Sequence, residues 1–309
     1  MLTLLASLCA TSLARAADTS PQVWLISTCG MPQCGDLDAA LQDACYWKLD
    51  EQCEWSCADA EDFRNTEDAS MPTVVFVHGN RVSEENAVAG TLCVYRIIRG
   101  QACGRAFRYV IWLWPAERAI RPFGKDARLK TIYCDAESYY LAQWLNKLDA
   151  GAQVSLVGYS FGSRIVTGAL DLLAGGELAG RRLPESTVDE WKAGKRNPVR
   201  AVLLAAAIDA DWLQCHSPTL KLVDRMLVTC NGCDLLLRMY SRLNGRGGPQ
   251  AMGYVGPCFN DVDNKVAVVD VSGQVGRIHD MRRYSAASGV CCRWAYYTFL
   301  EDSTPQNAP

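Results

Sequence analysis

A serine stands between two glycines in the segment Gly158-Tyr159-Ser160-Phe161-Gly162, which follows an apolar run and precedes a helix-like stretch. A serine there occupies a strained turn, and a side chain at Gly158 or Gly162 would collide with the strand or helix beside it. The turn lifts the hydroxyl clear of a sheet and places it at a helix N-terminus, where unpaired N–H groups can face an anion. The pattern predicts nucleophilic chemistry at Ser160, with Gly158 and Gly162 shaping the turn.

Strand-like and helix-like segments alternate along the chain, which predicts a mostly parallel central sheet with helices on both faces. A Gly-x-Ser-x-Gly turn between a strand and a helix of such a sheet is the nucleophile elbow of the α/β-hydrolase fold. We therefore expect one α/β-hydrolase domain over residues 18–302. A large cap domain is not expected, because residues 210–224 are too few to form one.

Apolar and periodic runs place the expected elements, while residues 30–70 are polar and give no clear assignment. The expected strands are 23–28, 73–77, 108–114, an elbow strand from 154, 199–208, 225–229 and 265–271, and the expected helices are 84–98, 136–148, one after the elbow and one near 296–300.

A serine hydroxyl is a weak nucleophile at neutral pH and needs a neighbouring base, which a third group must orient. In this fold the order along the chain is Ser, then Asp or Glu, then His. His279 lies in a loop after the last expected strand and is the expected base. His78 precedes the serine and so cannot be the base in this order. His216 precedes the expected acid and is interpreted as a packing or surface residue.

The acid is expected just beyond strand 225–229, where Asp234 lies. Asp209 and Asp211 end the preceding strand, a location that some relatives use, and they stay open as alternatives. The oxyanion of an acyl-transfer reaction needs two backbone donors. The expected donors are the N–H of Phe161, directly after the serine, and the N–H of Asn80, in the loop after strand 73–77.

Several segments together resemble a known family: Val74–Arg81, Val110–Pro115, Ser138–Leu141, Val154–Ile165, Asp234–Tyr240 and Ile278–Asp280. They are similar to exported α/β-hydrolases of planctomycetes and related bacteria, over residues 22–300. More distantly, they resemble a hydrolase-like family with a His-Gly-Tyr/Asn oxyanion loop. The resemblance implies a triad of Ser160, Asp234 and His279. It implies no particular substrate, because reactions are largely unassigned in that family.

The N-terminus has the pattern of a signal peptide over residues 1–17. An apolar segment, Leu2–Leu13, precedes Ala14-Arg15-Ala16-Ala17, which offers a small-x-small cleavage site, although no Lys or Arg precedes the apolar run. We expect an exported protein that is periplasmic, bound at the cell envelope or secreted. The mature chain has no apolar run of the ~18 residues that a membrane span needs, and residues 303–309 are expected to form a flexible tail.

Export changes how the 15 cysteines are interpreted. Without Cys9 an even number remains, which is compatible with disulfide pairing, above all in the Cys-rich N-terminal segment 29–70. Cys230 and Cys233 form a C-x-x-C pair without a second such pair, so a disulfide or two buried thiols are favoured over a metal site.

The formal net charge of −3 gives no electrostatic reason to expect a nucleic-acid partner. The chemistry needs no cofactor and no metal. The sequence therefore predicts an exported serine hydrolase that cleaves a carboxylic ester or thioester, with a small-molecule or polymer-linked substrate. Two alternatives remain: a catalytically inactive α/β-hydrolase scaffold that binds a partner at the envelope, and a serine peptidase that uses the same triad.

Overall fold

The computed structural model describes residues 21–301 except 39, 244–246 and 260–262, so the expected signal peptide and tail lie outside the described residues. Within this part of the chain, nine strands form one sheet in the order β3-β2-β1-β5-β4-β6-β7-β8-β9. The strands are β1 Gln22–Ser27, β2 Cys45–Leu49, β3 Trp55–Ala58, β4 Thr73–Val77, β5 Arg108–Leu113, β6 Val154–Tyr159, β7 Val199–Leu204, β8 Val223–Cys230 and β9 Val266–Asp270.

The sheet is parallel from β1 to β9 across its central strands, and β2 and β3 form an antiparallel hairpin at one edge. This confirms the expected α/β fold with a mostly parallel sheet. Parallel strands end at the same edge, so the loops after β4, β6, β8 and β9 meet there. Between β7 and β8 the structure has the four-residue helices α6 and α7 and no cap domain.

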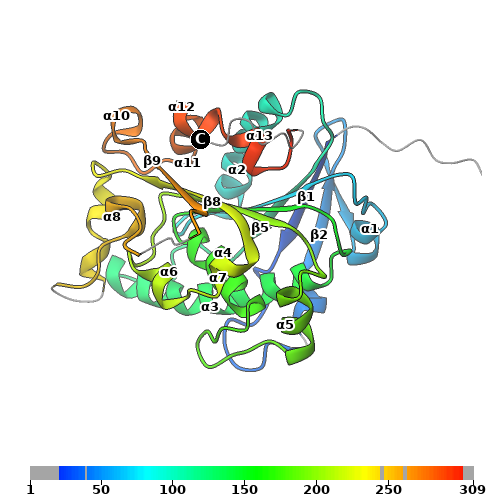
Figure 1. Ribbon diagram of the computed structural model, residues 1–309, viewed down its shortest axis with the longest axis horizontal. Coiled ribbons are helices and arrows are strands. Elements are labelled where there is room, and N and C mark those ends of the chain that lie inside the picture. The colour runs from blue at the N-terminus through cyan, green and yellow to red at the C-terminus, as the bar shows by residue number, and fades with distance from the viewer. Residues whose placement is uncertain (1–20, 39, 244–246, 260–262, 302–309) are drawn as a thin grey trace, which may run out of the picture.

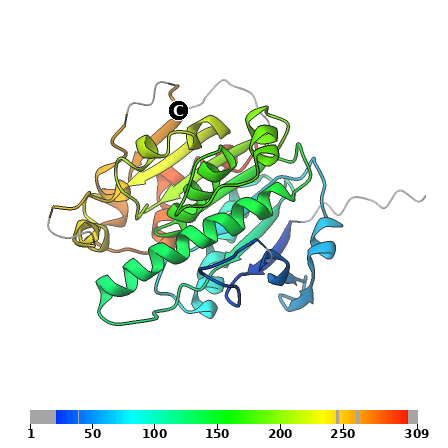
Figure 2. The same cartoon turned by 90° about the horizontal axis from the view of Figure 1, so that it is seen from below.

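Helices cover both faces of the sheet, as Figures 1 and 2 show, with α2 and α11–α13 on one face and α3, α4 and α5 on the other. The helices are η1 Ala40–Asp43, α1 Ala60–Arg64, α2 Glu84–Gln101, α3 Phe123–Asn146, α4 Gly162–Leu173, α5 Glu185–Lys192, α6 Trp212–Cys215, α7 Thr219–Leu222, α8 Leu235–Arg238, η2 Tyr240–Arg242, α9 Met252–Val255, α10 Ser272–Val275, α11 Met281–Ala286, α12 Ser288–Cys291 and α13 Trp294–Tyr297.

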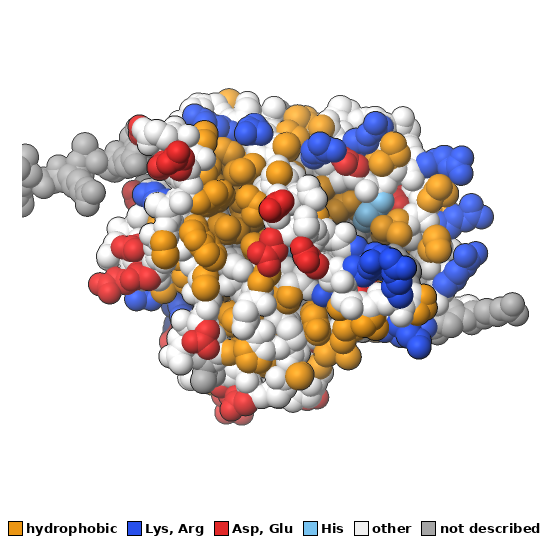
Figure 3. Space-filling view, turned by 180° about the vertical axis from the view of Figure 1, so that it is seen from behind, with side chains coloured by type: hydrophobic (Ala, Val, Ile, Leu, Met, Phe, Trp, Pro, Cys, Tyr) orange, Lys and Arg blue, Asp and Glu red, His pale blue; other side chains and the backbone are white. Residues whose placement is uncertain are grey.

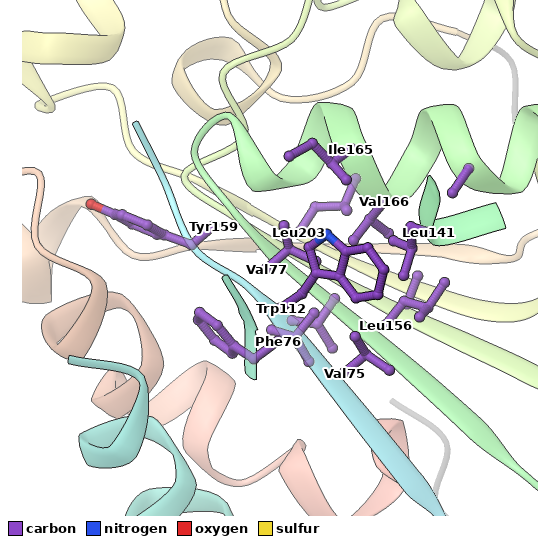
Figure 4. Packing of buried hydrophobic residues seen from close by; sticks show 14 of the residues in the cluster. Val75, Phe76, Val77, Trp112, Leu141, Leu156, Tyr159, Ile165, Val166 and Leu203 are labelled. Carbon is purple, nitrogen blue, oxygen red and sulfur yellow. The ribbon is translucent and has the colours of Figure 1, made fainter. Parts of the chain in front are cut away.

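The central strands are buried on both faces, which is why they are continuous apolar runs in the sequence. Every residue of β4, β5 and β6 is buried. Figure 4 shows Ile165 and Val166 of α4 packed with Trp112 of β5, while Phe76 and Tyr159 point to the opposite face. This two-sided core holds the ends of β4 and β6 in fixed register, with Val77 opposite Gly158.

Helix α3 and the hairpin β2–β3 differ most from the sequence expectation, and the expected strand 199–208 ends at Leu204. Helix α3 begins at Phe123 rather than at residue 136. Charged residues in its first half interrupt the apolar pattern from which the sequence could have predicted this part of the helix. The hairpin β2–β3 forms within the polar segment 30–70 because its inner face finds aromatic partners. Trp24 and Tyr46 both pack against Phe63, at ring distances of 5.1 and 6.2 Å.

The expected disulfides are not present, because all fourteen cysteines among the described residues are free thiols. Strand register explains part of this difference. Cys57 of β3 lies opposite Trp47 and Cys45 of β2 lies opposite Ser27, so neither cysteine faces another across the ladder. None of the described helices is long and apolar enough to span a bilayer.

Helix α3 is fixed to the sheet by a buried carboxyl group, Glu137. Its Oε2 accepts hydrogen bonds from Thr28 Oγ1 at 2.8 Å and Trp112 Nε1 at 3.0 Å, and its Oε1 accepts one from Gln33 Nε2 at 3.0 Å. Burial raises the pKa of Glu137 to about 7, although each of these hydrogen bonds lowers it. The carboxyl group is therefore protonated more readily in the folded protein than in the unfolded chain.

This pKa difference makes stability depend on pH. An unfolded glutamate has a pKa near 4.5, so between pH 4.5 and 7 unfolding releases a proton that the folded protein holds. The free energy of unfolding should fall as pH rises through this window, by about 3 kcal/mol at most. Glu137→Gln should flatten that part of the profile, because an amide does not titrate. Urea unfolding of both proteins at a series of pH values measures the difference, and identical slopes would contradict this account of α3.

Candidate active site

The turn 158–162, here called the elbow, joins β6 to α4 and holds Ser160 at a backbone φ of 55°, a left-handed conformation that non-glycine residues rarely adopt. The strain persists because the turn is bonded on both sides. The N–H of Ser160 donates to Leu204 O at 2.9 Å, and its carbonyl accepts from the N–H of Ala207 at 3.2 Å. The end of β7 thus holds the serine in place.

Glycine is required at both ends of the elbow by close backbone contacts. A Cβ at Gly158 would lie 2.6 Å from Ser163 Cα, and a Cβ at Gly162 would lie 2.1 Å from Val77 O. Neither neighbour can move without displacing α4 or β4. The two glycines therefore let the first turn of α4 press against the ends of both strands.

The structure brings together three side chains that are far apart in the sequence. His279 Nε2 lies 3.0 Å from Ser160 Oγ, and His279 Nδ1 lies 2.7 Å from Asp234 Oδ2. Ser160 follows β6, Asp234 caps α8 after β8, and His279 lies in the loop between α10 and α11. The imidazole is held between a hydroxyl and a carboxylate, the geometry in which it can take a proton from one while the other fixes its tautomer.

Asp234 is a fully buried carboxylate whose charge is balanced by four hydrogen bonds. Its Oδ1 accepts from the N–H groups of Leu236 and Leu237 at 2.8 and 3.0 Å. Its Oδ2 accepts from Tyr284 Oη at 2.7 Å as well as binding His279. Burial alone would raise the pKa of Asp234, but the hydrogen bonds and the charge of His279 bring it below its ordinary value. The group stays ionised at neutral pH.

Tyr284 is a site residue that sequence reasoning missed. Its hydroxyl is buried beneath His279 on α11, and its ring lies edge-on to the imidazole at 6.3 Å. A tyrosine five residues after the histidine carries no recognisable motif. The one available signal was the short apolar-polar pattern of 281–286, which predicts a helix and hence a buried face next to His279.

The alternative acids have other partners. Asp209 Oδ1 accepts from Tyr240 Oη at 2.9 Å, and Asp211 occupies the position before α6. His216 pairs with Asp171 Oδ2 at 2.8 Å and stacks on Trp212, so it takes no part in this cluster. Among these candidates, the structure places only Asp234 beside His279.

The loop after β4 carries the expected oxyanion donor Asn80 and is held from behind by Trp114. The indole Nε1–H donates to His78 O at 2.9 Å, and the backbone N–H of Trp114 points at His78 Nε2 at 3.4 Å. Burial lowers the pKa of His78 to about 4, so this ring is neutral. Gly79 lets the loop approach the elbow, because a Cβ there would lie 3.0 Å from Ser160 Cβ.

A cavity of about 560 Å³ opens over the serine. Ser160, His279, Phe161 and Asn80 all line it, so the two residues expected to supply oxyanion donors border the same space as the serine. Within the described residues no hydrogen bond occupies the N–H of Phe161 or Asn80. The same described residues contain no group of three or more His, Cys, Asp or Glu side chains that could hold a metal ion.

The cavity has a wall of small and apolar side chains on each side. Helix α2 contributes Ala87, Ala89 and Gly90, and the segment from α8 to residue 243 contributes Leu236 and Leu243. Such a wall suits a hydrocarbon part of a substrate, while the polar groups converge at the serine.

Comparisons with known proteins add little to this geometry. No protein-family model matches the chain, and no curated protein matches it. A solved structure of an acetyl xylan esterase is similar with a TM-score of 0.35 and 13% identity, covering 75% of this chain and 99% of that one. A similarity at this level carries no argument. The resemblance to planctomycete hydrolases finds no support in these comparisons.

The Tyr284 hydroxyl offers a direct test of how Asp234 is held. Tyr284→Phe removes one hydrogen bond to a buried charge and leaves the ring in place, so kcat/KM for the ester hydrolysis that the sequence predicts should fall about tenfold. Tyr109→Phe is the matched control, because it removes a buried hydroxyl that donates to Thr91 O outside the cavity. Esterase assays and thermal unfolding of both variants separate the two roles. Equal activity losses in the two variants would contradict a specific role for Tyr284.

Proposed function

We propose that this protein is a serine hydrolase that cleaves a carboxylic ester or thioester through an acyl-enzyme. The observation that carries the proposal is the continuous hydrogen-bonded chain from Ser160 Oγ through the His279 imidazole to the Asp234 carboxylate, with distances of 3.0 and 2.7 Å. A strained serine at a helix N-terminus, a buried carboxylate and an open cavity above the hydroxyl all favour acyl transfer.

In the first half of the reaction, Ser160 Oγ attacks the substrate carbonyl carbon while His279 Nε2 takes the hydroxyl proton. Asp234 keeps the Nδ1–H of the imidazole directed toward itself and stabilises the imidazolium ion. The bond to the leaving oxygen or sulfur then breaks, and His279 returns the proton to that atom. The acyl group remains on Ser160.

In the second half, water replaces the leaving group. His279 accepts a proton from the water as its oxygen attacks the acyl carbon, and Ser160 leaves with that proton when the product acid departs. Both tetrahedral intermediates carry a negative oxygen. Phe161 and Asn80 line the cavity with Ser160, and their backbone N–H groups would donate to this oxygen, each such donor being worth about 3 kcal/mol of barrier.

The substrate fits an ester of moderate size, either free or attached to a polymer. The cavity volume of about 560 Å³ accommodates an acyl chain along the apolar wall of α2 or α8. No cap domain separates it from solvent between β7 and β8. Export to the periplasm, the envelope or the medium is part of the proposal and rests on the pattern of residues 1–17.

Labelling with a fluorophosphonate probe tests the nucleophile. The wild-type protein should be labelled at Ser160, and Ser160→Ala should abolish both labelling and hydrolysis of p-nitrophenyl esters, with kcat falling by about a millionfold. Mass spectrometry of the labelled peptide identifies the modified residue. A folded wild-type protein that remains unlabelled would favour an inactive scaffold. Hydrolysis of peptides but not of esters would favour a peptidase.

Paired substitutions test which aspartate is the acid. Asp234→Asn should lower kcat by about ten-thousandfold, because the amide no longer holds the productive imidazole tautomer. Asp209→Asn should leave kcat within a few-fold of wild type, because Asp209 binds Tyr240 instead. Steady-state kinetics on one activated ester compares the two. The reverse ranking would reassign the acid.

A further inference from the structure

The rim of the catalytic cavity exposes large apolar side chains. Leu235, Leu236 and Met239, on and just after α8, are 40–43% exposed, and Ile278, next to His279, is 47% exposed. Ile120, in the loop between β5 and α3, is 41% exposed. Single exposed apolar residues need no explanation, but a cluster around a cavity mouth indicates a surface that meets an apolar partner.

Hydrogen bonds link the segments that carry these side chains, here called the rim, to one another or to a residue that lines the cavity. The N–H of Leu235 donates to Arg277 O, which joins the start of α8 to the residue before Ile278. On the other side, Asp126 Oδ1 accepts from the N–H of Ile120 at 3.1 Å, and its Oδ2 accepts from Arg81, which lines the cavity. The loop 116–122 is therefore tied to the mouth.

Arginines are interleaved with the apolar residues of this rim. Segments 116–122, 235–243 and 277–283 together hold seven arginines, all exposed, and two acidic residues, Glu117 and Asp280. Figure 3 shows a histidine in a hollow of this face, with apolar side chains beside it and Lys or Arg side chains around it. Outside these three segments, two exposed acidic side chains, Glu84 and Glu85, lie at the start of α2. The chain as a whole has a formal net charge of −3, whereas the seven arginines and two acidic residues of these three segments give them a net charge of +5.

We propose that this rim docks the protein on an anionic lipid surface, with the catalytic cavity facing the membrane. The arginines would pair with negatively charged headgroups, while Leu235, Met239, Ile120 and Ile278 enter the boundary of the acyl region. A purely hydrophilic polyanion would satisfy the arginines but leave the apolar side chains in water. The docking needs no bond to be made or broken, so it goes beyond the proposed hydrolysis and can be tested without it.

Vesicle co-sedimentation of the Ser160→Ala protein tests the docking independently of catalysis. One set of vesicles contains phosphatidylcholine alone, and in the other phosphatidylglycerol replaces about a third of the lipid. We expect binding to the anionic vesicles only, and weaker binding as salt is raised, because ions screen exposed charges. Arg238→Gln/Arg242→Gln should weaken this binding about thirtyfold, since each cation near an anionic surface contributes about a factor of five.

The apolar contribution is tested by Leu235→Gln/Met239→Gln, neither of which lines the cavity. Binding to anionic vesicles should weaken about tenfold or more. Ile132→Gln on α3 and Lys192→Gln/Lys195→Gln, beside the amino ends of the strands, are matched controls that should bind like the parent. Binding that ignores headgroup charge, no binding to either vesicle, or capture by soluble dextran sulfate without vesicle binding would overturn the proposal. Loss of ester hydrolysis with intact docking would refute only the proposed function.

Discussion

The close approach of the first turn of α4 to the end of β4 is the constraint on which the site depends. At Gly162 the space left for a side chain is already filled by Val77 O, 2.1 Å from where a Cβ would stand. Next to this contact Ser160 has a left-handed backbone conformation, with φ of 55°, in the turn that leads into α4. The contact brings the loop after β4 alongside the serine, so the nucleophile and a potential oxyanion donor are positioned by the same contact. The two-sided core of β4, β5 and β6 keeps the contact from relaxing.

A second set of contacts joins the later strands to the serine through one buried charge. Asp234 would be costly to bury without compensation, and its donors come from α8, α11 and the histidine loop. Asn231 Nδ2 donates to Gly276 O at 2.9 Å and ties the turn after β8 to the same loop. The carboxylate therefore orients the imidazole and also organises three short segments that have little core of their own. At this edge of the sheet, the hydrogen bonds of Asp234 therefore both stabilise the fold and position the imidazole of His279.

Much of the fold and the three-residue cluster could be predicted from sequence because both follow from strong local signals. A strand such as β4, TVVFV, is apolar throughout, and the elbow combines a strand, two glycines and a helix within a few residues. The rule on chain order selected His279, and the position just beyond strand 225–229 favoured Asp234. Tyr284 was not predicted because its role depends on a hydrogen bond to Asp234, which lies fifty positions earlier in the sequence. The hairpin β2–β3 was not predicted because Tyr46 packs on Phe63 of α1, and Phe63 in turn packs on Trp144 of α3, so its stabilising contacts come from other elements.

The rim shows that the composition and net charge of a sequence do not predict how apolar and charged side chains are distributed over the surface. The run Leu235-Leu236-Leu237 has the composition of a buried helix. Because α8 is only about one turn long, it packs on the protein with one side, so Leu237 is buried while Leu235 and Leu236 are exposed. Likewise, a net charge of −3 describes the sum of a basic rim and acidic surfaces elsewhere. In the proposed hydrolase, no cap domain lies between β7 and β8, so a substrate would meet the rim before it meets the serine. The mixed apolar and cationic character of the rim would then act at the approach step, by setting which surfaces hold the cavity close enough for Ser160 to react.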